Sequence, residues 1–104
     1  MTKYIFAYHG GSTPETPEEQ EKVMAEWMTW IEAHGAAWFD SGSPVGNSKT
    51  VHSDGSVTDD GGANPLSGYA FVTADSYDAA IEIARGCPIL KDGGSVEVAP
   101  VHEM

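Results

Sequence analysis

Two residues near the ends of predicted strands, His9 and Asp40, have side chains suited to proton transfer. His9 ends the apolar run KYIFAYH, and Asp40 lies in the run AAWFDSG, directly after Phe39. An imidazole titrates near neutral pH, and a carboxyl group shielded from water holds its proton to higher pH, so both groups can serve as acid or base. The sequence therefore offers a His9–Asp40 acid–base couple. The alternative is that both are solvated strand ends with local hydrogen bonds.

Three further side chains could hold a small substrate. Trp30 is offset from the main apolar stripe of its predicted helix, and Tyr69 lies on a predicted strand, so the two rings could border a pocket for a planar ligand. Lys49 is a cation near a glycine-rich loop and could hold a carboxylate or phenolate. The ordinary alternatives are core packing for the aromatic residues and solvation for the lysine.

The remaining histidines and the cysteine favour structural roles. The four histidines lack the HxH, HxxxH and Cys–His spacings of preformed metal sites. His34 lies at a helix end, where the helix dipole favours an imidazolium. Cys87 follows a predicted helix C-terminus, where the dipole disfavours a thiolate, and we expect it to be buried. We expect no metal and no other cofactor.

A long amphipathic helix is predicted between Thr16 and Gly35. Thr16 and Glu19 have the spacing of a capping box, and Pro17 suits the first helical position. Apolar residues then recur at steps of three and four, which is typical of a helix with one buried face; they are Val23, Met24, Trp27, Met28, Trp30 and Ile31.

Strand-like runs and a second helix complete the pattern. The strands are predicted at 3–9, 36–42, 68–74 and 95–101, and the helix YDAAIEIAR is capped by Asp75 or Ser76. The runs SKTVH and SVTD flank Asp54-Gly55, which suits a two-residue type I′ hairpin turn. This order predicts a single α+β domain over residues 1–104, a ferredoxin-like βαββαβ protomer with a β-hairpin insert.

The predicted sheet has more apolar surface than two helices can cover. Its first strand carries Tyr4, Phe6 and Tyr8 on one side, and Ile5 and Ala7 on the other. Two helices cover one face of such a sheet, and monomers rarely expose the other when it is apolar. A second copy packed on that face by a two-fold axis is the simplest cover, so we expect a homodimer.

Composition argues against several partners. The chain has 104 residues with 16 acidic and 5 basic side chains, a net charge of −11. Nucleic acids and anionic membranes attract basic surfaces, so we expect neither as a partner. Cys87 is the single cysteine, so no internal disulfide can form, and we expect a cytoplasmic protein.

The pattern resembles the YCII-related family of dimeric α+β barrel proteins, which includes the DGPF-type sequences. The resemblance is carried by KYIFAYHG, W-x-x-W-I at 27–31, G-x-P-x-G-x-S-K-T-V at 42–51, NPLSGYAFV at 64–72, and the closing runs ARGCPIL and GGSVEVAPVHEM. It implies ferredoxin-like protomers whose sheets meet in a dimer, with a cleft between sheet and helices in each subunit. Related barrels include dehydrochlorinases, lactone isomerases and cofactor-free monooxygenases.

Two departures from the family pattern concern its suggested chemistry. The better-studied branch pairs a histidine on the first helix with a downstream aspartate, and Met24 stands at that histidine position when the sequences are aligned on Gly35. The DGPF motif is replaced by DDGGANP. Two hypotheses therefore remain: a cofactor-free enzyme acting on an aromatic or lactone-like molecule through His9 and Asp40, or a dimeric ligand-binding or regulatory module without chemistry.

Overall fold

A four-stranded antiparallel sheet with the strand order β2-β5-β1-β6 forms the centre of the computed structural model, which describes residues 1–11 and 14–102. The elements in chain order are β1 (Thr2–His9), α1 (Pro17–Ala33), β2 (Trp38–Pro44), β3 (Thr50–Val51), β4 (Val57–Thr58), β5 (Leu66–Ala74), α2 (Tyr77–Arg85) and β6 (Ser95–Pro100). Without the β3–β4 hairpin this order is βαββαβ, so the ferredoxin-like prediction is confirmed.

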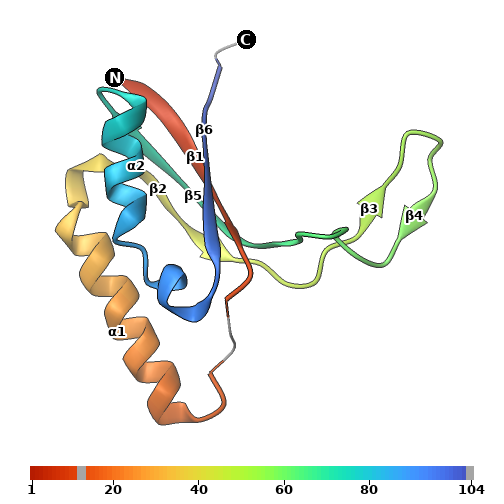
Figure 1. Cartoon of the computed structure of the whole chain (residues 1–104), viewed down its shortest axis with the longest axis horizontal. Helices are drawn as coiled ribbons and strands as arrows, with labels where there is room; N and C mark the ends of the chain where they lie inside the picture. Colours follow the sequence, from red (N-terminus) through yellow and green to blue (C-terminus); the bar gives the residue numbers. More distant parts are fainter. Residues whose placement is uncertain (12–13, 103–104) are drawn as a thin grey trace.

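Both helices lie on the same side of the sheet (Figure 1). Thr16 Oγ1 accepts a hydrogen bond from Glu19 N at 3.1 Å, so the predicted cap begins α1. Ser76, and not Asp75, caps α2 by accepting from Ala79 N at 3.1 Å. Within residues 1–11 and 14–102, no helix has the length and apolar composition needed to cross a membrane.

Tryptophans join the two layers. Trp30 is 6% exposed, and its Nε1 donates to Ile83 O at 2.9 Å, which ties α1 to α2. Its ring packs edge-on against Trp38, with 4.9 Å between centroids, and stacks on Phe6, a fully buried residue of β1. Aromatic burial of this kind stabilises a small core strongly. The helices are thereby fixed over the middle of the sheet.

Two local predictions need correction. The second strand begins at Trp38 and not at residue 36, because Gly35–Ala37 form a short 3₁₀ turn in which Ala37 N donates to His34 O at 2.8 Å. The hairpin turn is also longer than predicted, since His52 N donates to Ser56 O at 2.8 Å and leaves three residues in the loop.

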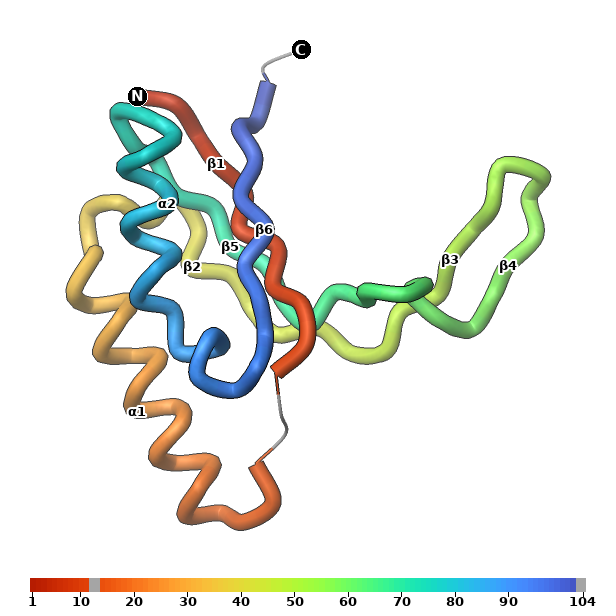
Figure 2. Tube along the Cα trace, in the orientation of Figure 1, coloured from red at the N-terminus to blue at the C-terminus, as the bar shows by residue number. Residues whose placement is uncertain are grey.

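The β3–β4 hairpin forms an arm, residues 45–65, that leaves the end of the sheet and extends to the side opposite the helices (Figures 1 and 2). Val51 and Val57 lie opposite each other on it, 71% and 56% exposed. At its base Val45 N donates to Ser67 O at 3.0 Å. The arm is thus an extension anchored on β5.

The sheet face away from the helices is largely apolar, as predicted. Ile5 lies opposite Phe71 and Ala7 opposite Tyr69, and the rings of Phe71 and Tyr69 pack edge-on at 6.2 Å. Phe39 is 62% exposed. We call this surface the open face.

Candidate functional site

A cleft of about 640 Å³ lies between α1 and one end of the sheet. The helix contributes apolar side chains, which are Val23, Met24, Trp27, Met28 and Ile31. The sheet contributes Tyr8 and two segments, 41–44 of β2 and 67–69 of β5. Clefts of this size that are mostly apolar with a few polar groups are typical of small-molecule sites. This cleft matches the one that the family resemblance implies.

A β-bulge in β5 shapes the floor of the cleft. Tyr8 pairs with Gly68 and His9 pairs with Leu66, so Ser67 is one residue more than β1 can match. Ser67 lines the cleft together with Tyr8 and Gly68. A Cβ on Gly68 would lie 3.1 Å from the Tyr8 ring, so the ring rests directly on the glycine.

A second bulge lies beside it in β2. Two residues of β2, Ser41 and Gly42, lie opposite a single residue of β5, Ala70. Gly42 has a φ of 76°, and a Cβ there would lie 1.7 Å from Tyr69 O. Gly42 N donates to Asp40 Oδ1 at 2.8 Å, so the carboxylate of Asp40 supports this turn. Glycine is required here to form the cleft wall.

Two residues that line the cleft carry buried hydroxyl groups without a hydrogen-bond partner in the described part of the chain: Tyr8 Oη and Ser67 Oγ. Burial raises the pKa of Tyr8 far above its ordinary value, and the nearby Cys87 raises it further, so the phenol stays neutral. An unpaired buried hydroxyl costs about 1–3 kcal/mol. Two such groups among the residues of one cleft are candidates for hydrogen bonds to a ligand.

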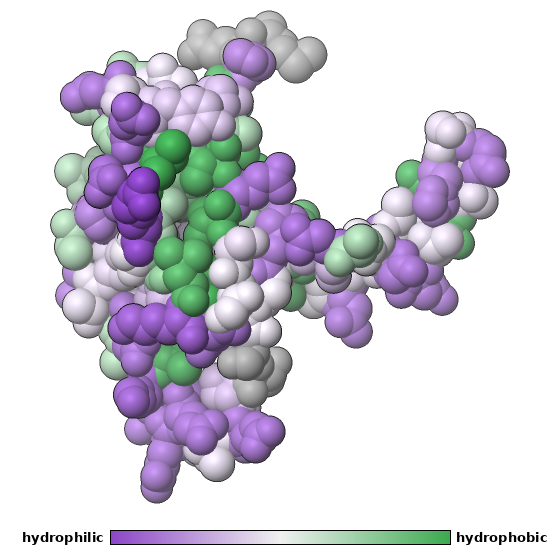
Figure 3. Space-filling view, in the orientation of Figure 1, coloured by the Kyte–Doolittle hydropathy of each residue, from purple (hydrophilic) through white to green (hydrophobic). Residues whose placement is uncertain are grey.

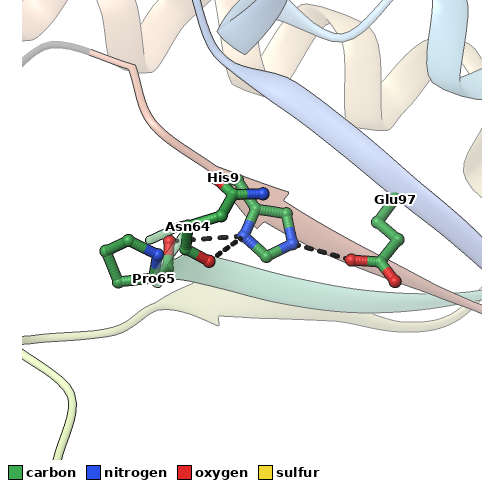
Figure 4. Close-up of polar contacts among 4 residues, drawn as sticks. All are labelled: His9, Asn64, Pro65 and Glu97. Carbon is green, nitrogen blue, oxygen red and sulfur yellow. Dashed lines mark hydrogen bonds and ion pairs between the residues drawn. The ribbon is translucent and has the colours of Figure 1, made fainter. Parts of the chain in front are cut away.

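His9 is 8% exposed and both its ring nitrogens face acceptors (Figure 4). Nδ1 lies 3.0 Å from Asn64 O and 3.3 Å from Pro65 O, and Nε2 lies 2.9 Å from Glu97 Oε1. Carbonyl and carboxylate oxygens only accept, so each contact is a hydrogen bond in which the ring nitrogen is the donor. His9 therefore fastens the base of the arm to β1 and β6.

The structure does not bring His9 and Asp40 together. Asp40 pairs with Phe71, which pairs with Ile5, so Asp40 is aligned four residues before His9 and two strands away. With ~3.3 Å per residue along a strand and ~4.8 Å between neighbouring strands, the Cα atoms of His9 and Asp40 are about 16 Å apart. Each side chain instead has its own partner, Glu97 for His9 and Gly42 for Asp40.

The three predicted substrate-binding residues also lie apart. Trp30 is in the core and not along the cleft. Lys49 is on the arm, where its Nζ lies 3.1 Å from Asp59 Oδ1 and its side chain is 71% exposed. Tyr69 borders the cleft, and its ring packs against Phe71 on the open face, so we infer that it contributes mainly its backbone.

Of the residues that line the cleft, the sequence indicated Tyr69 as a site residue but not Tyr8, Ser67 or Trp27. The bulge at Ser67 interrupts the pairing of β5 with β1, and the period of the strand does not predict it. Gly42 and Gly68 are the signal that was available, because a glycine inside a strand often marks a bulge.

Cys87 is 2% exposed, so its predicted burial is confirmed, and this burial raises the pKa of the thiol to about 11. Within the described residues, no three His, Cys, Asp or Glu side chains gather as the ligands of a metal ion would.

A second groove, of about 390 Å³, lies between α2 and β6. Its lining includes Ile81, Leu90, Val96 and Val98, and Figure 3 shows hydrophobic side chains between these two elements. It has no unpaired hydroxyl of the kind found in the cleft among the residues that the structure describes.

The model of the YCII-related domain matches residues 2–104, nearly the whole chain. The chain belongs to the YCII family. A comparison of this YCII-family chain with curated protein sequences found no match.

Among solved structures, the chain is similar to TftG, the 5-chloro-2-hydroxyhydroquinone dehydrochlorinase from Burkholderia phenoliruptrix AC1100, in complex with 2,5-dihydroxybenzoquinone. The TM-score is 0.58 at 16% sequence identity, and the match covers 100% of this chain and 96% of TftG. At this identity the likeness establishes the shared fold.

Proposed function

We propose that the cleft between α1 and the bulged end of the sheet binds a small organic molecule. The observation that carries the proposal is the composition of the cleft: an apolar helix face opposes a floor that includes Tyr8 and Ser67, two residues with buried unpaired hydroxyls. Apolar walls supply affinity, and a few polar groups supply orientation. TftG supports the proposal to the extent that a protein of the same fold forms a complex with a small organic molecule, 2,5-dihydroxybenzoquinone.

Binding without chemistry fits the geometry better than acid–base catalysis does. His9 is enclosed by backbone carbonyls and Glu97, and Asp40 supports the Gly42 bulge, so neither has a free partner in the cleft. Met24 borders the cleft at the position where the better-studied branch of the family has its histidine. Acid–base catalysis is therefore the competing hypothesis, and the binding experiment is combined with an assay for turnover.

The three tryptophan indoles provide a direct test. In ¹⁵N-labelled protein, an uncharged aromatic probe such as 2-acetylnaphthalene should shift the indole N–H resonance of Trp27, which lines the cleft. The indoles of Trp30 and Trp38 donate to Ile83 O and Ile31 O and should move less. No shift at Trp27, or shifts confined to residues of the α2–β6 groove, would contradict the proposal.

Turnover is checked in the same samples. Mass spectrometry of the incubated probe, or of a panel of phenols and lactones, should show no product formed faster than in buffer. A product whose formation is lost in His9→Ala and Asp40→Asn, with folding intact, would instead establish the acid–base enzyme.

We also propose that the open face is covered by a second copy of the chain. Its apolar residues include Ile5, Phe39 and Phe71. The arm extends on the same side of the sheet (Figure 1), so a partner seated on the open face would lie alongside the arm and its exposed Val51. The charge of −11 disfavours close approach of two copies, and burial of this apolar surface must exceed that repulsion.

Light scattering after size-exclusion chromatography tests the homodimer. The wild type should have twice the mass of the chain, and Phe71→Lys should convert it to a monomer because the ammonium would be buried between sheets. Leu90→Lys, in the groove on the helix side, is the control and should stay dimeric. A monomeric wild type at micromolar concentration would overturn the proposal.

A further inference from the structure

We propose that the cleft selects uncharged aromatic carbonyl compounds, whose carbonyl oxygen accepts hydrogen bonds from Tyr8 Oη and Ser67 Oγ. This inference rests on the proposed function, because it names the ligand class of the same cleft. It goes further by assigning two anchor residues and by excluding carboxylates, phosphates and phenolates as preferred ligands.

The absence of charge among the described residues that line the cleft excludes strong anion binding. A buried anion needs a cation or several donors to offset its desolvation. Lys49 is held by Asp59 on the arm, and Lys3 lies 3.7 Å over the ring of Phe39 on the open face, so neither cation serves the cleft. The net charge of −11 adds a general repulsion.

The two unpaired hydroxyls define the polar group of the ligand. A neutral tyrosine and a serine each bring one O–H donor, and a carbonyl oxygen has two lone pairs to accept them. Tyr8 pairs with Gly68, the residue next to Ser67, so both residues lie at the same end of the cleft. An acceptor placed there satisfies donors that the fold leaves unpaired, which is where a hydrogen bond contributes most to selectivity.

The shape and adaptability of the cleft favour a flat aromatic body. The Trp27 and Tyr8 rings meet edge-on at 5.2 Å between centroids and form an aromatic corner. Met24 and Met28 also line the cleft from α1 and are 60% and 53% exposed. Methionine side chains adjust easily to a guest, so these two can adapt to the shape of a bound ring.

Three probes of nearly the same shape separate the contribution of the carbonyl acceptor from that of charge. They are 2-acetylnaphthalene, the anion 2-naphthoate, and 2-isopropenylnaphthalene, in which a CH₂ group replaces the carbonyl oxygen. Dissociation constants are measured by equilibrium dialysis with the full chain. We expect the ketone to bind more tightly than the alkene by about 3- to 10-fold, the effect of one or two neutral hydrogen bonds. The naphthoate should bind most weakly.

Variants locate the effect. Tyr8→Phe and Ser67→Ala should each weaken binding of the ketone by about 3-fold and leave binding of the alkene unchanged. Tyr77→Phe removes a hydroxyl that donates to Val98 O outside the cleft, and it should change neither. Circular dichroism and thermal melts confirm that each variant folds.

The outcomes distinguish this inference from the function on which it rests. If ketone and alkene bind equally, or if the ratio between them survives both cleft variants, the cleft binds small molecules but the hydroxyl anchor is wrong. Preferred binding of naphthoate would also refute the ligand class. If none of the three probes binds, the proposed function fails together with its anchor.

Discussion

Ser67 and Tyr8 line the same cleft, and Ser67 is the residue by which β5 exceeds β1 between the Tyr8–Gly68 and His9–Leu66 pairs. The hydroxyls of both residues are buried. Neither hydroxyl is satisfied by the described chain, so the fold holds two polar groups at a cost in stability. Such a cost is understandable where the groups have a task in binding.

Removing either hydroxyl should make the free protein more stable. Tyr8→Phe and Ser67→Ala eliminate a buried unpaired donor without removing a hydrogen bond, so the free energy of unfolding should rise by about 1 kcal/mol each. Urea denaturation measures the change. A loss of more than ~1 kcal/mol in either variant would show that the hydroxyl has a stabilising partner in the free protein. That hydroxyl would then not be available to bind a ligand.

Gly42 should tolerate no side chain. Gly42→Ala places a Cβ 1.7 Å from Tyr69 O at a φ of 76°, so the bulge must rearrange, and we expect a loss of at least ~3 kcal/mol. Gly46→Ala is the matched control, because a Cβ at Gly46 meets no atom within 4 Å, and it should change stability by less than ~1 kcal/mol. Similar melting temperatures for the two variants would contradict the described cleft wall.

The buried thiol of Cys87 makes the protein sensitive to alkali. Burial raises the thiol pKa from 9.0 to about 11, so the folded state retains a proton that the unfolded chain loses first. The stability contribution is therefore complete below pH 9 and is lost towards pH 11, by roughly 2–3 kcal/mol. The raised pKa of Tyr8 acts in the same direction.

The measurement is the free energy of unfolding at several pH values between 8 and 11 in wild type and Cys87→Ala, where the variant should show the shallower decline. A thiol reagent at neutral pH should label the native protein only as fast as it opens, since the thiol is 2% exposed. Immediate stoichiometric labelling of folded protein would refute the buried assignment.

The fold could be predicted because its signals are local. The Thr16–Glu19 cap, the three- and four-residue spacing from Val23 to Ile31, and the apolar run of β1 each specify an element without knowledge of the rest of the chain. The order of elements then leaves few topologies. The difference at residues 35–37 is small, because the sequence places an element well and leaves only its exact ends open.

The site could not be predicted in the same way. Trp27 and Trp30 have similar sequence surroundings, and the helix crossing that buries Trp30 beside Ile83 leaves Trp27 to line the cleft. His9 and Asp40 were joined by residue type, yet strand register separates them. Register and bulges depend on contacts across the sheet, which a single sequence does not reveal.

The most direct test of the central claim fills the cleft from the helix side. Met24→Trp and Met28→Trp together replace two exposed rim residues with larger rings, while Leu90→Trp makes the same kind of change in the α2–β6 groove. We predict that the double variant folds and loses at least about 10-fold in affinity for 2-acetylnaphthalene, as expected for a blocked apolar site, whereas Leu90→Trp binds like the wild type. Unchanged affinity in the double variant, with affinity lost in Leu90→Trp, would place the ligand outside the cleft and contradict the proposed binding site.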